Sequence, residues 1–120
     1  MKKPKFVFDE VFGIGFFICF KWTREEINSF LKKKYKYNNS QTSSTYGTLF
    51  EMHNPDKDIV HHILWVDADK PEHIIMQGLA HEAVHLKNKI FLSAGVELDL
   101  RNDETEAYYV SMIVRKALES

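Results

Sequence analysis

The sequence contains a single cysteine, no long apolar run and no excess of either charge sign. The lone cysteine, Cys19, excludes an internal disulfide and is compatible with a reducing compartment. Because Cys19 lies in a run of apolar residues, we expect a buried core thiol rather than a reactive one. Sixteen Lys and Arg stand against seventeen Asp and Glu, and the resulting formal net charge of −1 argues against a general nucleic-acid binder.

Membrane and targeting signals are also missing. No stretch approaches the ~20 apolar residues that a membrane-spanning helix needs. The basic residues Lys2 and Lys3 precede apolar residues, as in a signal peptide, but Asp9 and Glu10 interrupt them and no small-residue cleavage site follows. We therefore expect a cytoplasmic protein without a membrane partner.

The composition is that of a folded globular protein. The chain has 120 residues, of which 44% are hydrophobic and 13% aromatic. This length is enough for one modest hydrophobic core and too short for two, so a single domain over residues 1–120 is expected.

The N-terminal third predicts a hairpin followed by a helix. Short apolar stretches at 6–8 and 16–22 are typical of strands, and the glycines at 13 and 15 mark the turn between them. Thr23 and Glu26 have the spacing of a capping box, in which each side chain accepts a hydrogen bond from the backbone of the other residue. A helix should begin there.

Two further strands and two helices follow. The polar residues 38–45 predict a loop, residues 45–52 a strand, residues 54–56 a turn and residues 59–66 another strand, in which the side chains alternate between the two faces. Helices are expected at 71–92 and from 102 or 103 to 118, with a connection between them. The order β-β-α-β-β-α-α predicts an α+β domain with a small, mainly antiparallel sheet of about four strands.

The chemistry of the chain is concentrated in His81-Glu82-Ala83-Val84-His85, an HExxH motif. On a helix, positions i and i+4 share one face, so both imidazoles can reach a single metal ion. Zinc suits neutral imidazole ligands and lowers the pKa of a coordinated water toward ~7. Glu82 points off the ligand axis, where it can take a proton from that water. The motif therefore indicates metal-assisted hydrolysis with zinc as cofactor.

The surrounding residues support a helix with separate metal and core faces. Pro71 suits a first helical turn, and Asp69 is a candidate N-cap. One apolar stripe at intervals of three and four predicts the core face, and His81 and His85 lie off it, together with the small Gly78. The stripe consists of Ile75, Leu79, Ala83, Leu86 and Ile90.

A catalytic zinc site usually has three protein ligands and one open position. No histidine follows His85, so the candidates for a third ligand are the acids of the last helix, Asp103, Glu104 and Glu106. Glu104 and Glu106 lie about 200° apart on a helix and cannot both serve. Periodicity does not decide between them, because both continue into apolar positions along the helix.

His81-Glu82-x-x-His85, followed by Glu104 in an Asn-Asp-Glu-Thr-Glu-Ala-Tyr stretch, resembles the gluzincin class of zinc metallopeptidases. The resemblance is closer to small phage- and prophage-encoded HExxH proteins, whose last helix carries a Glu-x-x-Ala-Tyr pattern, and it covers the chain from about Ile63 to the end. It implies that Glu104 is the third zinc ligand. Many gluzincins place an aspartate four residues after that ligand, to orient a histidine, where this chain has Tyr108.

Hydrolysis also needs a donor for the developing oxyanion. Residue type alone suggests several donors and does not distinguish among them. We name Tyr108 as the expected catalytic donor beside Glu82. The full set is Tyr46, His61, His62, Tyr108 and Tyr109.

Two functions follow as hypotheses. The first is a zinc-dependent peptidase that holds an extended peptide or protein substrate by edge pairing, with the strand at 59–66 as the expected partner. The second is a non-catalytic zinc-containing interaction module that binds a host or phage protein. Glu82 favours the enzyme, because a purely structural zinc site has no need of a carboxylate that is not a ligand.

Overall fold

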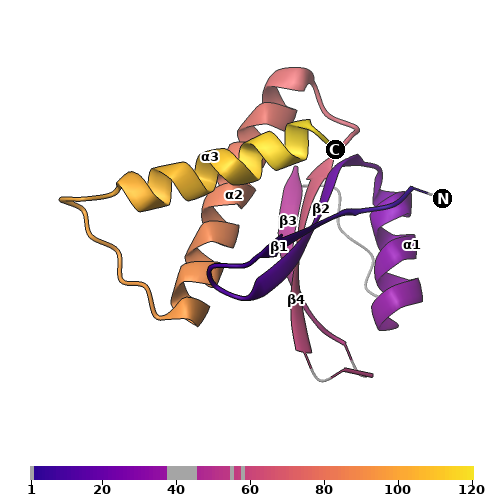
Figure 1. Cartoon of the computed structure of the whole chain (residues 1–120). Helices are drawn as coiled ribbons and strands as arrows, with labels where there is room; N and C mark the ends of the chain where they lie inside the picture. The colour runs from indigo at the N-terminus through magenta and orange to yellow at the C-terminus, as the bar shows by residue number, and fades with distance from the viewer. Residues whose placement is uncertain (1, 38–45, 55, 58) are drawn as a thin grey trace.

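A computed structural model describes residues 2–37, 46–54, 56–57 and 59–120. The predicted loop at 38–45, and the Pro55 of the predicted turn, lie outside these described residues. The element order and the α+β class match the prediction (Figure 1). The elements are β1 (Lys5–Asp9), β2 (Ile14–Trp22), α1 (Arg24–Tyr35), β3 (Gly47–Asn54), β4 (Ile59–Asp67), α2 (Glu72–Ala94) and α3 (Glu104–Leu118).

The four strands form one mixed sheet in the order β1-β2-β4-β3. The β1–β2 and β3–β4 pairs are antiparallel, as expected for hairpin neighbours, and the central β2–β4 pair is parallel. The sheet is thus mainly antiparallel. Because β4 lies between β2 and β3, both of its edges are paired, which corrects the expectation that residues 59–66 offer an edge to a substrate. The outer strands are β1 and β3.

Helices cover both faces of the sheet (Figure 1). On one face, α1 packs on a core that includes Phe17, Cys19 and Trp65. On the other face, α2 and α3 pack on Phe16 and Leu64. The alternation predicted for β4 is confirmed, because Ile63 and Trp65 lie in the first core and Leu64 and Val66 in the second. Cys19 is fully buried, and burial raises the pKa of its thiol, so it is the core thiol that was predicted.

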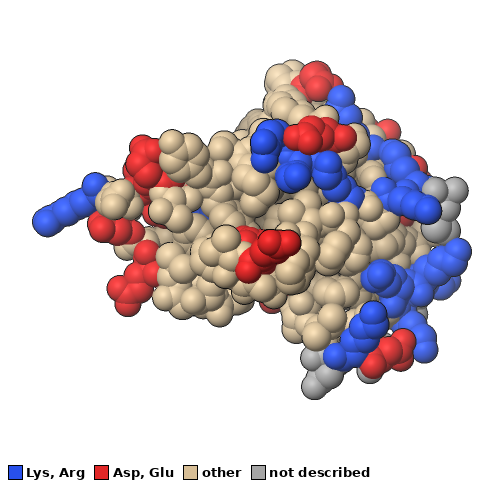
Figure 2. Space-filling view, viewed as in Figure 1, with Lys and Arg blue, Asp and Glu red and all other residues tan. Residues whose placement is uncertain are grey.

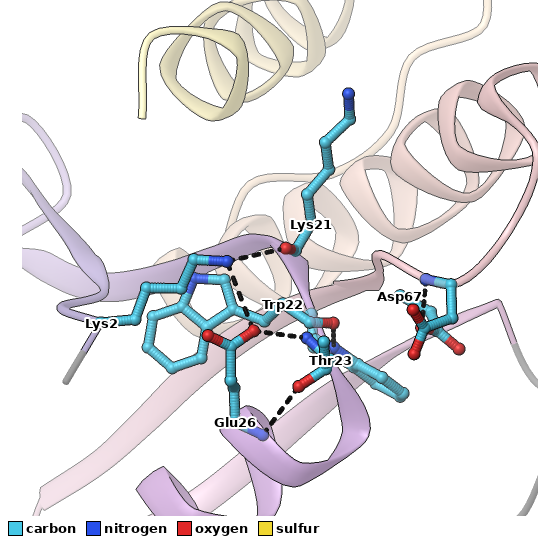
Figure 3. A network of polar contacts seen from close by, with 8 residues as sticks. Lys2, Lys21, Trp22, Thr23, Glu26 and Asp67 are labelled. Carbon is cyan, nitrogen blue, oxygen red and sulfur yellow. Dashed lines mark hydrogen bonds and ion pairs between the residues drawn. The ribbon is translucent and has the colours of Figure 1, made fainter.

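The capping box of α1 is present as predicted. The Thr23 hydroxyl accepts a hydrogen bond from Glu26 N, and the Glu26 carboxylate accepts one from Thr23 N at 2.8 Å (Figure 3). The pKa of Glu26 is lowered, first by this backbone hydrogen bond. Lys2 Nζ donates to Lys21 O and pairs with Glu26, which ties the N-terminal segment to the start of α1 (Figure 3).

Helix α2 begins differently from the prediction and buries the predicted stripe. Its N-cap is Pro71, whose carbonyl accepts hydrogen bonds from Ile74 N and Ile75 N, whereas Asp69 does not cap the helix. All five residues of the apolar stripe are buried. At the other end, Gly95 adopts a left-handed φ of 73° and its N–H bonds to Leu92 O, which is a common helix stop.

Helix α3 settles the choice between its two possible core faces. Tyr109, Ile113 and Ala117 are buried, and this face continues back to the half-buried Glu106. Glu104 lies on the exposed side. Among the helices of the described residues, none is long and apolar enough to cross a membrane.

Candidate metal and hydrolytic site

The two histidines of the HExxH motif converge as helical spacing predicts. His81 and His85 lie on the exposed side of α2, one turn apart, and their Nε2 atoms are 3.1 Å apart. The rings meet edge to face, with centroids 4.7 Å apart. Both Nε2 atoms are therefore close enough to contact one ion beside the helix.

This spacing fits two ligands of one zinc ion. Nitrogens at two tetrahedral positions, each ~2.0–2.1 Å from a zinc ion, lie about 3.3 Å apart. The observed 3.1 Å is close to that separation. Without a metal, the same distance suits a hydrogen bond in which one neutral imidazole donates to the other. The two imidazole nitrogens are thus spaced as two ligands of one zinc ion would be.

Glu82 lies beside the pair but turns toward the sheet. Its Oε2 is 4.0 Å from His81 Nε2, and the residue is only 5% exposed. Burial raises the pKa of Glu82 above its usual value, while the two histidines and a hydrogen bond from the Leu49 backbone N–H act in the opposite direction. The carboxylate is therefore held in place by the backbone of β3. A carboxylate with a raised pKa is a stronger base than an ordinary exposed glutamate, which suits a general base.

Two glycines allow β3 and the preceding residue to approach α2 closely. A Cβ on Gly47 would lie 2.5 Å from the Trp65 carbonyl oxygen and 3.4 Å from Glu82 Cγ. A Cβ on Gly78 would lie 3.3 Å from both the ring and the carbonyl oxygen of Tyr46. Sequence reasoning placed Gly78 on the metal face but did not identify Gly47 or the Leu49 amide. The glycine at the start of β3 was the available signal, because glycine in a strand often marks close backbone approach.

Tyr46 is the candidate donor that reaches the site. Its ring meets the His81 ring edge to face, with centroids 5.7 Å apart. Tyr46 lies immediately before β3 and rests on α2 at Gly78. The Tyr46 ring therefore lies next to the two histidines.

Among the described residues, no contact joins the other candidate donors to His81 or His85. Tyr108 is exposed and faces β1, at the sheet edge opposite β3. Tyr109 is buried in the core and donates to Asp9 Oδ2 at 2.6 Å. His61 Nδ1 is 2.7 Å from the Tyr35 hydroxyl on the α1 side. His62 is buried on the other face, 3.9 Å from Glu51, and burial lowers its pKa.

Within the part of the chain that the structure describes, no third ligand lies at the histidines. Among residues 2–37, 46–54, 56–57 and 59–120, no three His, Cys, Asp or Glu side chains are grouped so that they could hold a metal ion. Glu104 begins α3 with an exposed side chain, and Glu106 is bound by Lys87, with Nζ and Oε1 2.7 Å apart. Glu104 as third ligand stays a prediction, and Glu106 is already paired.

Comparisons with known proteins add no information on the function of this site. Neither the family models, nor the curated proteins, nor the solved structures contain a match to this chain.

Proposed function

We propose that the chain is a small zinc-dependent peptidase whose site is built on α2 and the β3 edge. The observation that carries the proposal is the convergence of His81 Nε2 and His85 Nε2 beside the buried Glu82. Two neutral imidazoles are good zinc ligands, and a zinc ion held there would polarise a carbonyl and activate water. Glu104 is proposed as the third ligand from the resemblance to gluzincins.

Each side chain has a distinct role in this proposal. Glu82 accepts a proton from the attacking water on its carboxylate, since the Leu49 amide fixes its position and burial raises its pKa. Tyr46 donates a hydrogen bond to the developing oxyanion, because its ring contacts His81. Tyr46 takes this role in place of Tyr108, which faces β1.

The proposed substrate is an extended peptide. The outer edge of the described sheet next to Glu82 belongs to β3, and an extended peptide can add to an outer strand through main-chain hydrogen bonds. The peptide carbonyl would then lie along the same side of the sheet as α2. This arrangement replaces the one first expected, in which β4 received the substrate.

The decisive test is Glu82→Gln in protein loaded with zinc. Glutamine keeps the shape of the side chain but cannot accept the proton, so cleavage of a peptide library should fall by about 10²–10⁴-fold while zinc content stays that of the wild type. Glu72→Gln makes the same change at the exposed start of the same helix and should keep activity. A Glu82→Gln protein that folds, holds zinc and cleaves as well as the wild type would falsify the proposal.

The second candidate is the non-catalytic zinc module. It is favoured by the positions of the groove beside β1 and the pocket beside α1, neither of which is lined by His81, Glu82 or His85. This function predicts that zinc stabilises the protein, that no peptide in the library is cleaved, and that Glu82→Gln changes stability or zinc content instead of a rate.

A further inference from the structure

Strand β1 forms the edge of the sheet opposite the candidate site. Its inner side pairs with β2, and within the described sheet no strand pairs with its outer side (Figure 1). In an antiparallel pair, half of the backbone N–H and C=O groups of an outer strand point away from its neighbour. An unprotected edge of this kind is a template for pairing with another strand.

Large apolar side chains are exposed along this edge. Phe6 is 51% exposed and Phe8 58% exposed, although the Phe6 ring also packs on Phe17 with centroids 4.9 Å apart. A groove of about 720 Å³ runs along β1 and is closed on one side by Tyr108 and Met112 of α3. Uncharged surface covers much of the middle of the face in Figure 2, around one acidic patch, and many of the Lys and Arg side chains lie on the side of the N terminus and α1. Exposed apolar surface of this extent is typical of an interaction site.

The sequence of β1 is complementary to itself. It reads Lys5-Phe6-Val7-Phe8-Asp9, which places a cation at one end, an anion at the other, and a Phe-Val-Phe centre between them. If two copies pair in antiparallel orientation about Val7, each Lys5 lies opposite Asp9 of the other copy. Each Phe6 then lies opposite Phe8, and the two valines face each other across the two-fold axis.

We propose that β1 is the interface of a symmetric homodimer, in which two copies pair through this strand into a continuous eight-stranded sheet. Opposite charges and aromatic pairs directly across an antiparallel ladder are both favourable. A two-fold interface requires one patch that is complementary to itself, and the Lys-Phe-Val-Phe-Asp pattern meets that requirement.

The charges also select the orientation. In a parallel arrangement, Lys5 would face Lys5 and Asp9 would face Asp9, and like charges directly opposite each other are destabilising. The ends of the strand limit the register, because Pro4 has no backbone N–H and the chain turns after Asp9, where Gly13 N bonds to Asp9 O. Antiparallel pairing centred on Val7 uses the whole strand.

Asp9 remains able to accept a further hydrogen bond in this dimer. Its Oδ1 accepts hydrogen bonds from Val11 N and Phe12 N, and its Oδ2 accepts one from the Tyr109 hydroxyl. A carboxylate offers about four acceptor positions, so a Lys5 ammonium can be added. These contacts hold the Asp9 side chain in one orientation before the second copy arrives, which lowers the entropic cost of pairing.

The dimer leaves the candidate hydrolytic site free. Strand β3 lies at the far edge of each sheet, so the two β3 edges become the two ends of the eight-stranded sheet. The proposal does not depend on hydrolytic activity and is tested separately from it.

The first experiment measures dimerisation of the full chain by sedimentation equilibrium, over roughly a hundredfold range of protein concentration. Wild-type protein should show a concentration-dependent rise from monomer mass to dimer mass. Lys5→Glu places a carboxylate opposite Asp9 twice in each dimer and should weaken association by about tenfold or more. Lys33→Glu makes the same change on the exposed surface of α1 and should dimerise like the wild type. Wild-type protein that stays monomeric throughout, or equal dimerisation by all three proteins, overturns the proposal.

The second experiment tests the register and does not depend on the folding of the charge variant. Val7→Cys places two thiols opposite each other at the two-fold axis, within the distance range of a disulfide. Val11→Cys gives a thiol at an 86% exposed position. In this register, position 11 of one copy lies far from position 11 of the other copy. Mild oxidation should cross-link the first variant into a covalent dimer and leave the second mainly monomeric, and the buried Cys19 takes no part. Equal cross-linking of both variants means that β1 does not pair in this way.

Discussion

At the scale of single residues, burial decides how the titratable side chains beside α2 and β3 behave. The pKa of Glu82 is raised by burial, and the pKa of His62 is lowered by the same cause. Both shifts favour the neutral form, because a low-dielectric surrounding penalises charge of either sign. Their consequences for stability appear in different pH ranges.

His62 should make the fold sensitive to mild acid. Its pKa in the folded protein lies below the value of ~6.5 in an unfolded chain, so between these two values the unfolded chain binds a proton that the folded chain does not. The free energy of unfolding should then fall as the pH drops below about 6.5, at up to about 1.4 kcal/mol per pH unit. Urea unfolding at several pH values measures this slope.

The matched variant for this prediction is His62→Gln, which does not titrate. The unfolding free energy of the wild type minus that of the variant should decrease as the pH falls from about 7.5 to about 5.5. The pKa of Glu82 in the folded protein lies above ~4.5, so the contribution of Glu82 to stability increases as the pH falls. This contribution is the same in both proteins and cancels in the difference. A pH-independent difference would show that His62 titrates alike in the folded and unfolded chain.

Gly47 should not tolerate a side chain. Gly47→Ala would bring a Cβ to 2.5 Å from the Trp65 carbonyl oxygen, so the backbone of β3 or β4 must shift. We expect a loss of about 1–3 kcal/mol in the free energy of unfolding, together with weaker zinc retention if Glu82 moves with the strand. Thermal and urea unfolding check the first effect and metal analysis the second.

Gly15→Ala is the comparison for this change. Its Cβ would also approach an atom within 2.5 Å, but that atom is the end of the exposed Phe6 ring, which can rotate away. The cost should therefore be clearly smaller than for Gly47→Ala. Equal costs at the two glycines would argue against the close approach of β3 to β4 and α2.

At the scale of elements, the orientation of α3 separates its two glutamates. The buried face of the helix carries Tyr109 and Ile113 and continues to Glu106, which pairs with Lys87 of α2. The Lys87 side chain is only 7% exposed, so its ammonium depends on this partner. Glu104 lies on the exposed side, and among the described contacts its side chain forms no ion pair of this kind.

Glu106→Ala should therefore destabilise the fold, and Glu104→Ala should not. Removing one partner of a buried ion pair leaves an uncompensated charge, at a cost of about 3 kcal/mol or more. Glu104→Ala in zinc-free protein should stay within about 0.5 kcal/mol of the wild type. If Glu104 is the third ligand, the same variant loses zinc retention, so unchanged zinc content in Glu104→Ala would remove it from the proposed site.

A double variant isolates the charge as the cause. Lys87→Met with Glu106→Leu removes both charges and leaves apolar side chains of similar size, so it should be less destabilised than Glu106→Ala alone. Urea unfolding of the three proteins gives this ranking. If the double variant is the less stable of the two, packing and not an unpaired ammonium explains the effect.

At the scale of the whole molecule, the two outer strands of the sheet define two separate surface regions. The β3 edge carries the candidate site with α2, and the β1 edge carries exposed aromatic residues and the groove beside α3. Only the first region contains the HExxH residues. Ligands at the two edges can therefore be studied one at a time.

Zinc should stabilise the whole fold through the first region. A ligand that binds only the folded state adds about 2.7 kcal/mol at a concentration a hundredfold above its Kd. Thermal unfolding with and without zinc should show a rise in Tm for the wild type and none for His85→Ala, since that variant retains a single imidazole of the pair. An equal rise in both proteins would place the zinc elsewhere.

The sequence by itself determined the order of the elements and the part of the candidate site that lies within α2. The capping box at Thr23, the alternation in β4 and the apolar stripe of α2 depend on local spacing, and all three were predicted correctly. The convergence of His81 and His85 is also local, because four residues make about one helical turn. Periodicity therefore predicted what lies within one helix or strand.

The tertiary structure alone decided which elements meet. Because β2 pairs with β4 in parallel, β3 and not β4 is the outer strand, and this pairing depends on the path of the chain rather than on local pattern. The same holds for the Leu49 amide at Glu82 and for Lys87 at Glu106, which join residues from different elements. Such contacts are set by how helices pack on a sheet, and residue spacing along the chain does not encode that packing.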